Sequence, residues 1–190
     1  MIIFNNINIP KNYKCSAIAI GNFDGVHKGH QKVFEKTKKF SSKKKIKFGI
    51  LTFTPLPIMF FNKKINNFRL VSEDKKFKLF EKYGVDFVIN IRFNKNFSEI
   101  SAEKFIKKII YKKINPQLLS VSSNFKFGKK RKGDIDLLKK FSDKYDYQLL
   151  NIRAIKYKGK IISSTKIREC LQNGNIYLAN KLLSRTWFVD

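Results

Sequence analysis

The chain has only two histidines, and they lie three residues apart, at His27 and His30. An apolar run, Ala17–Ile20, precedes them and an amphipathic run follows, so the pattern predicts a strand, a glycine-rich turn and a helix. A helix N-terminus attracts phosphate, because its first N–H groups are exposed and its dipole is positive there. Two imidazoles at that place add donors that can follow charge as it develops on a phosphoryl group. This segment therefore predicts a phosphate site.

The rest of the chain alternates between strand-like and helix-like segments. Strands are expected at residues 16–21, 46–53, 86–91, 118–121 and 148–154, and helices at residues 30–40, 72–83, 101–113 and 135–145. Such alternation is typical of an α/β fold, with a mostly parallel sheet and helices on both faces. No repeat or linker interrupts it, so we expect a single domain over residues 1–190. Ligands of such sheets bind beyond the carboxyl ends of the strands. The glycine-rich turn with both histidines, residues 21–30, lies at such an end and is named the histidine turn.

A hydroxyl-rich segment, Ser163, Ser164 and Thr165, stands at the expected start of a late helix. Hydroxyls at this position either cap the helix or bind an anion. Arg168 follows Ser164 by one helical turn on the same face, so both side chains could hold one phosphate group. Alone, the segment also fits an ordinary helix cap beside a surface arginine. The histidine turn favours the anion site.

A basic loop follows the fourth expected strand and contains Asn124, Phe125 and Phe127. Its glycines, Gly128 and Gly133, have the spacing of a P-loop, but the Lys-Ser/Thr pair that a P-loop requires is missing. The sequence therefore argues against a Walker-type NTPase. The loop either lies on the same rim as the histidines or is a solvated basic loop, and its residues alone leave both interpretations open.

An aromatic loop follows the second expected strand. Pro55 and Pro57 restrict its backbone, and Met59, Phe60 and Phe61 follow them. Such a loop either forms the wall of a pocket for a flat ring or covers a small satellite core.

The formal net charge of +27 raises the question of nucleic-acid binding. The basic residues are 35 lysines and only 6 arginines, and the lysines are spread over the whole length of the chain. A dedicated binding face would favour clustering and more arginine, whose guanidinium binds phosphate with two hydrogen bonds. We therefore expect a solvated basic surface and no specific nucleic-acid partner.

The sequence contains no apolar run long enough to span a membrane, and its N-terminus lacks the pattern of a signal peptide. Its two cysteines, Cys15 and Cys170, are far apart, which suggests reduced thiols. We expect a cytoplasmic protein with no membrane partner.

A resident metal is not expected, because two histidines would need a third protein ligand and zinc-binding pairs on helices are usually four residues apart. Mg²⁺ carried in by a nucleotide fits better, since it binds phosphate oxygens and water. Covalent catalysis has little support, because both histidines belong to the glycine-rich turn and neither cysteine has an evident partner.

Taken together, these segments resemble the FAD synthetase module, the FMN adenylyltransferase half of the bacterial bifunctional riboflavin kinase/FAD synthetase family. A His-x-Gly-His pair alone marks the wider nucleotidylyltransferase superfamily. Its combination with Asp24, Gly25 and Val26, and with the helix that starts at Ser163, is more specific. The resemblance extends from Ser16 to Trp187 and includes Thr52–Phe53, Arg69–Leu70, Gly84–Asp86, Asn124–Gly128 and Ala179–Arg185.

The resemblance implies a Rossmann-like nucleotidylyltransferase fold and transfer of an adenylyl group from ATP to FMN, which gives FAD and pyrophosphate. It implies catalytic roles for His27, His30 and Arg168. A phosphate nucleophile is already ionised near pH 7, so a site rich in anion donors and without an evident base suits this reaction. The implied ATP contacts are Gly21, Asn22, Phe23, Asp24, Gly29, Asn124, Ser163, Ser164 and Thr165, and the implied flavin contacts are Pro55, Pro57, Phe125 and Phe127.

The chain also departs from the family pattern. The family usually has Asp and His where this chain has Thr54 and Leu56, and arginine where it has Lys126, so the flavin-side loop is altered. The family ordinarily continues into a riboflavin kinase domain. This chain stops at Asp190, so we expect no riboflavin kinase activity and a separate kinase as the source of FMN.

Two other interpretations stay open. One is a nucleotidylyltransferase with a different phosphorylated acceptor. The other is a non-catalytic basic remnant that binds nucleic acid.

Overall fold

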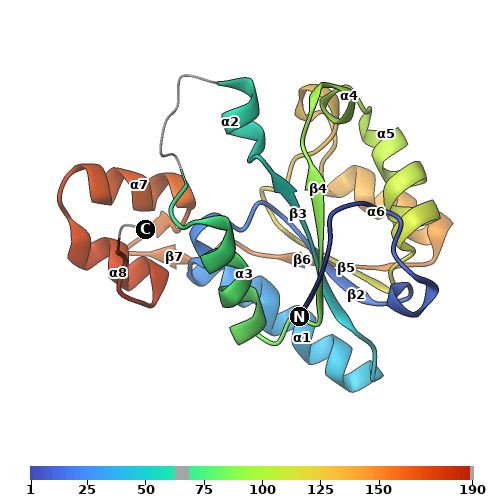
Figure 1. Cartoon of the computed structure of the whole chain (residues 1–190), viewed down its shortest axis with the longest axis horizontal. Coiled ribbons are helices and arrows are strands. Elements are labelled where there is room, and N and C mark those ends of the chain that lie inside the picture. The colour runs from blue at the N-terminus through green and yellow to red at the C-terminus, as the bar shows by residue number, and fades with distance from the viewer. Residues whose placement is uncertain (63–68, 189–190) are drawn as a thin grey trace.

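The structure, a computed structural model, describes residues 1–62 and 69–188 and is built on a six-stranded sheet with the order β1-β4-β3-β2-β5-β6 (Figure 1). Every pairing within this sheet is parallel. The strands are β1 (Ile2–Phe4), β2 (Ala17–Ile20), β3 (Phe48–Thr54), β4 (Phe87–Arg92), β5 (Leu118–Ser122) and β6 (Gln148–Ile152). The predicted α/β fold with a parallel sheet is confirmed, and the five expected strands are present. The short edge strand β1 was not indicated by the sequence pattern.

Helices cover both faces of the sheet, as predicted. One face packs against α1 and α3, and the other packs against η3 and α6. The helices of the α/β unit are α1 (Lys28–Lys44), α2 (Pro57–Phe61), α3 (Glu73–Lys82), α4 (Lys95–Ser98), α5 (Ala102–Lys104), η3 (Phe105–Ile114) and α6 (Ile135–Tyr145), with 3-10 turns at η1 (Lys11–Tyr13), η2 (Asp24–Val26) and η4 (Lys129–Arg131).

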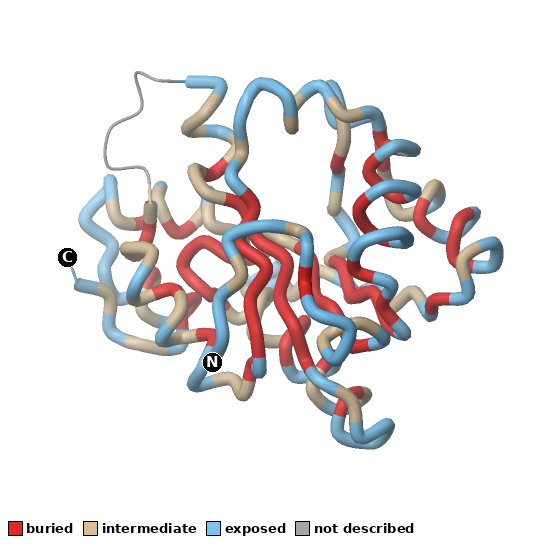
Figure 2. Tube along the Cα trace, turned by 45° about the vertical axis from the view of Figure 1, so that its right-hand side comes forward, coloured by how far each residue is buried: buried red, intermediate tan, exposed pale blue. Residues whose placement is uncertain are grey.

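Strand β2 shows why a continuous apolar run marks a central strand. All four of its residues are buried: Ile18 and Ile20 pack toward η3 and α6, while Ala19 packs toward α1 and α3. Alternate residues of a strand point to opposite faces, so a strand covered on both faces must be apolar throughout. The central strands accordingly form the most buried part of the molecule (Figure 2).

The strand order reverses beside β2, and this reversal fixes the place of a site. From β2 the chain continues to β3 and β4 on one side, whereas β5 and β6 lie on the other side. Connections that leave β2 and β5 therefore diverge and open a crevice beyond their carboxyl ends. The histidine turn follows β2, and the loop that contains Asn124 follows β5.

The C-terminal part of the chain forms a separate small core next to the sheet (Figure 1). An antiparallel hairpin, β7 (Lys156–Tyr157) and β8 (Lys160–Ile161), leads into α7 (Ser164–Gln172) and α8 (Ile176–Leu183). The sequence indicated the start of α7 but neither the hairpin nor α8. Helix α8 was missed because its eight residues are too few to show a clear period.

The expected helix at residues 101–113 has a different form. It begins as α5 and continues as the π-helical η3, which ends at Asn115 in the left-handed conformation with a φ of 49°. The same apolar residues are buried, because either coil places residues 105, 106, 109 and 110 on one side. Apolar spacing alone therefore does not separate an α-helix from a π-helix.

Gly49 in β3 provides a test of the packing within the sheet. A Cβ at this position would lie 2.3 Å from Cζ of Phe87 and 2.7 Å from Cδ1 of Ile18. We expect Gly49→Ala to lower the free energy of unfolding by about 1–3 kcal/mol, as overpacked cores do. Urea unfolding measures this loss. A Phe87→Leu background removes the two contacts with the Phe87 ring and leaves the one with Ile18, so the same substitution should cost less; an equal cost in both backgrounds would contradict the packing.

Candidate functional site

The histidine turn places His27 at the N-cap of α1, where its imidazole accepts hydrogen bonds from N–H groups of the first helical turn. Nδ1 of His27 accepts hydrogen bonds from the backbone N–H groups of Gly29, at 3.1 Å, and His30, at 3.4 Å. These bonds assign the proton of the neutral ring to Nε2. The backbone N–H groups of Gly29 and His30, which the sequence suggested as phosphate ligands, thus donate to the imidazole of His27. The Nε2–H of this imidazole remains as a donor.

The two imidazoles are stacked, with ring centroids 3.6 Å apart and an interplanar angle of 20°. The ring of Phe23 meets His30 edge-on at 5.2 Å. Burial lowers the pKa of His27 to about 4 and holds the pKa of His30 well below its usual value, and the neighbouring His27 lowers the latter further. Both rings are therefore neutral at pH 7, and they can serve as N–H donors but not as fixed cations. Nδ1 of His30 is buried, and no hydrogen-bond partner for it occurs among the described residues.

The turn itself has an unusual backbone. Phe23, Gly25 and Val26 have φ values of 50°, 76° and 41°, and all three residues are buried. Glycine adopts this left-handed region freely, but a β-branched residue such as valine does so only when the surroundings impose it. Strained backbone of this kind concentrates at functional sites.

A cavity of about 680 Å³ opens beside the turn, a size typical of small-molecule sites. It brings together segments that follow five different strands of the sheet: β2, β3, β4, β5 and β6. Of the residues that the sequence suggested, Gly21, Asn22, Phe23, His27, Gly29, His30, Pro57, Asn124, Phe125, Phe127, Ser163 and Ser164 line this cavity. The others, Asp24, Pro55, Thr165 and Arg168, are not among its lining residues.

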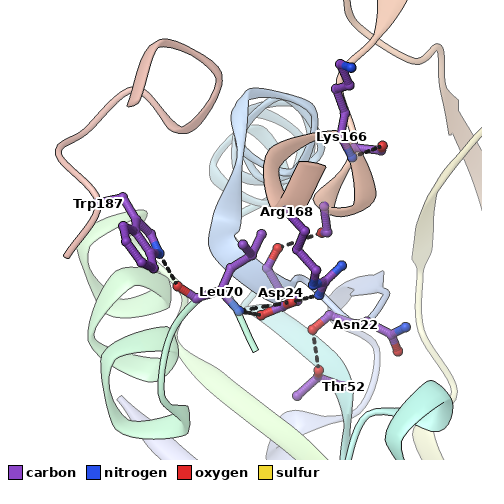
Figure 3. Close-up of polar contacts among 9 residues, drawn as sticks. Asn22, Asp24, Thr52, Leu70, Lys166, Arg168 and Trp187 are labelled. Carbon is purple, nitrogen blue, oxygen red and sulfur yellow. Dashed lines mark hydrogen bonds and ion pairs between the residues drawn. The ribbon is translucent and has the colours of Figure 1, made fainter. Parts of the chain in front are cut away.

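Asp24 forms polar contacts with residues from two other segments, Leu70 and Arg168 (Figure 3). Its carboxylate is buried, accepts a hydrogen bond from the backbone N–H of Leu70 and forms an ion pair with Arg168. The hydroxyl of Ser164 donates to the backbone carbonyl of Asp24, at 2.9 Å. Burial raises the pKa of Asp24, and the charge of Arg168 opposes this effect. The start of α7 is therefore fixed to the histidine turn by two side chains one helical turn apart.

Ser163 is the N-cap of α7, and its hydroxyl accepts from the backbone N–H of Lys166 at 3.1 Å. The capping interpretation of the hydroxyl segment therefore holds for Ser163. Ser163 and Ser164 also line the cavity, whereas Thr165 is exposed.

The other end of the cavity is aromatic. Phe125 and Phe127 are stacked with centroids 5.4 Å apart, and Phe105 lies 5.3 Å from Phe127. Phe93 and Phe97 complete this wall, 5.6 Å from each other. The sequence reasoning missed these last two residues and Phe105. Phe93 directly follows β4, so the rule that sites form at the carboxyl ends of strands was the signal that could have found it.

Basic side chains also line the cavity, namely Lys126, Lys130, Arg131 and Arg153. Lys126 forms an exposed ion pair with Asp134 at 3.2 Å. Arg153 was missed by the sequence reasoning, although it follows β6 directly. The cavity thus combines imidazole, hydroxyl and amide groups, a basic rim and an aromatic wall.

The altered loop after β3 is held by a polar network. The hydroxyl of Thr54 lies 2.8 Å from a carboxylate oxygen of Glu73 and 2.9 Å from the side-chain oxygen of Asn90. The side-chain NH₂ of Asn90 donates to Glu73, and Leu56 is buried. The loop is therefore anchored, and it presents Pro57 to the cavity.

No group of three or more His, Cys, Asp or Glu residues that could hold a metal ion occurs in residues 1–62 and 69–188. The polar groups that line the cavity are mainly hydrogen-bond donors and cations. Such groups suit phosphate oxygens.

The depressed pKa of His27 predicts a dependence of stability on pH. His27 binds a proton near pH 6.5 in the unfolded chain and near pH 4 in the folded chain. The free energy of unfolding therefore falls as the pH decreases between these values. His27 alone should remove roughly 3 kcal/mol from the free energy of unfolding over this range.

Urea unfolding at a series of pH values measures this effect. His27→Asn is the matched variant, because asparagine retains a good N-cap and does not titrate. We expect a shallower pH dependence in this variant, and equal slopes would contradict the burial of a neutral imidazole.

Comparison with solved structures shows the fold. The crystal structure described as a macrolide-efflux protein from Streptococcus pneumoniae has a TM-score of 0.84 at 23% identity, covering 97% of this chain and 60% of that one. Pantoate-beta-alanine ligase from Francisella tularensis has a TM-score of 0.55 at 16% identity, covering 97% of this chain and 78% of that one. At these identities the likeness concerns the fold alone. Within the described part of this chain, no helix has the length and apolar character to cross a bilayer.

Sequence comparison gives the family. The bifunctional riboflavin kinase/FMN adenylyltransferase of Buchnera aphidicola from Schizaphis graminum is 42% identical over 184 residues, 96% of this chain and 59% of the relative. The Escherichia coli K12 protein of the same name is 31% identical, covering 91% of this chain and 55% of the relative. The chain thus spans less than two thirds of these relatives. It is 30% identical to the FAD synthetase of Listeria monocytogenes, of which it covers 72%. Residues 9–166 match the family described as FAD synthetase, and the chain belongs to that family.

Proposed function

We propose that these 190 residues transfer the adenylyl group of ATP to the phosphate of FMN, which gives FAD and pyrophosphate. One observation carries the proposal: a single cavity is lined both by the His27–His30 pair with Ser163 and Ser164 and by an aromatic wall. A triphosphate suits the first part, and a flat flavin ring suits the second. Membership of the FAD synthetase family supports this assignment.

The residues toward the phosphates act by positioning and by donation. The Nε2–H of His27, His30 and the hydroxyl of Ser163 would bind phosphate oxygens of ATP, together with Asn124, while the hydroxyl of Ser164 keeps its bond to the carbonyl of Asp24. Because the donors are held by α1 and α7, they need little rearrangement when charge develops. Arg168 would keep the start of α7 against the histidine turn through its ion pair with Asp24, and its direct contact with the triphosphate stays a prediction.

The chemistry needs no general base in this scheme. An ionised oxygen of the FMN phosphate attacks the α-phosphorus of ATP, a new P–O bond forms, and the bond to the bridging oxygen of pyrophosphate breaks. The electron pair leaves with pyrophosphate, whose charge the N–H donors and the hydroxyl of Ser163 would stabilise. Mg²⁺ would arrive with ATP and bind its phosphate oxygens and water.

The aromatic wall would hold the flavin. Phe125 and Phe127 offer parallel faces on which a flat ring can stack, and Pro57 lies on the loop after β3. Lys130 and Arg131 on the rim would attract the phosphate of FMN. Thr54 and Leu56, which differ from the family pattern, do not line the cavity, and this favours a competent enzyme.

We further propose that the protein works in the cytoplasm, without a specific nucleic-acid partner. The free cysteines Cys15 and Cys170 suit a reducing compartment.

Incubation of the purified protein with FMN, ATP and Mg²⁺, followed by chromatography of the flavins, tests the proposal directly. We expect FAD to form from FMN and ATP. A folded protein that forms no FAD would refute the proposal. Pyrophosphate release with another phosphorylated acceptor would then assign a different substrate, and tight nucleic-acid binding without turnover would assign a different function.

His30→Ala tests the role of the histidine pair. We expect FAD formation to fall by about 100-fold or more, as when one preorganised donor is lost from an active site. The comparison of kcat with that of wild type measures the loss, and circular dichroism checks the fold. Lys112→Ala, on the exposed side of η3, is the control and should retain full activity. A fully active His30→Ala protein would falsify the assigned role.

A further inference from the structure

Gln31 is a part of the histidine turn to which neither the resemblance nor the proposed reaction assigns a role. It directly follows His30 on α1, and its side-chain NH₂ donates to two backbone carbonyls. One is the carbonyl of Val26, at 2.8 Å, and the other is that of Leu183, at 2.9 Å, 152 residues away in the sequence. An amide NH₂ has two N–H donors, so both are used.

Both carbonyls lie at the end of a helical segment, where a carbonyl has no backbone N–H partner within its own helix. Val26 has a φ of 41°, which takes the chain out of η2 before α1 begins. Leu183 is the last residue of α8, so its carbonyl lacks a partner within that helix. Its other contact, from the side chain of Arg185, is long, at 3.5 Å. A buried carbonyl without a donor is costly, and Gln31 satisfies one in each segment.

The carbonyl of Val26 is mechanically linked to His27. It belongs to the same planar peptide unit as the backbone N–H of His27, so a bond to that carbonyl fixes the plane from which the imidazole projects. The backbone N–H of Gln31 also donates to the carbonyl of His27, at 3.0 Å. Gln31 therefore holds the peptide units on both sides of the His27 Cα.

The second bond links this plane to the C-terminal helices. The end of α8 already packs against the turn, because a Cβ on Gly25 would lie 3.4 Å from Cδ2 of Leu183. Apolar packing of this kind does not fix an orientation, whereas two hydrogen bonds from one planar amide do. Gln31 thus provides a polar connection between α8 and the turn.

We propose that Gln31 is a positioning residue, whose amide orients the His27–His30 pair and couples it to the end of α8. Its kinetic consequence rests on the proposed adenylyl transfer. Its structural consequence, the orientation of the two imidazoles, does not.

Gln31→Met removes both donors and retains the length of the side chain, and Gln31→Leu is a second, stiffer substitution. We expect kcat for FAD formation to fall about 10-fold in each, because misplaced donors act on the transition state. The KM values for ATP and FMN should change by less than about threefold, since Ser163, Ser164 and the aromatic wall are untouched. Gln172→Met, at an exposed glutamine of α7, is the matched control and should behave as wild type.

A second measurement does not depend on turnover. Because the chain has only two histidines, ¹⁵N-histidine labelling gives imidazole signals that single substitutions assign. In wild type, we expect His27 to show a protonated Nε2 and an unprotonated Nδ1. In Gln31→Met the imidazole signals should shift and broaden, and in Gln172→Met they should not.

These two measurements separate the outcomes. If wild type forms no FAD while the imidazole signals respond to Gln31→Met, the proposed reaction fails and the positioning role stands. Wild-type kcat and unchanged imidazole signals in both Gln31 variants would overturn the positioning role. It would also be overturned if both variants fail to fold, since Gln31 would then serve overall stability.

Discussion

The burial of one carboxylate, that of Asp24, constrains the whole site. A charge withdrawn from water must be paired and hydrogen-bonded, because an isolated buried ion is very costly. The partners of Asp24 come from segments far apart in the sequence: the N–H of Leu70 before α3 and the guanidinium of Arg168 on α7. Meeting this one requirement brings the histidine turn, the loop before α3 and the C-terminal helices together. The carboxylate thus joins these three segments, and it is not among the residues that line the cavity.

The site relies on neutral donors and a rigid turn. Burial keeps His27 and His30 uncharged, so the site offers an anion oriented N–H groups and the basic residues of its rim. The left-handed backbone at Phe23 and Val26 carries strain that a loose turn would release. It persists because α1, α7 and α8 surround it. Order of this kind suits a reaction in which the nucleophile is already ionised and only geometry and charge need to be supplied.

The sequence predicted what is local and missed what is long-range. The strand, turn and helix around His27 were predicted because apolar runs and glycines act on their immediate neighbours. The place of Asn124 beside the same cavity followed from a rule about parallel strands. The ion pair between Asp24 and Arg168 was missed, because it depends on a contact across 144 residues that no local pattern encodes. Phe97 was missed for the same reason, since its place on the cavity wall depends on how α4 packs.

The wide sequence separation of these contacts has a consequence for synthesis. Ser164 and Arg168 contact Asp24 across 140 and 144 residues, and Leu183 contacts Gln31 across 152. A chain that grows from its N-terminus completes β2 and α1 early, and it must keep the histidine turn open until α8 has left the ribosome. Contacts of such separation also form late in folding, because long loops must close first. The histidine turn therefore completes its contacts only after α8 has been synthesised, about 150 residues later than the turn itself.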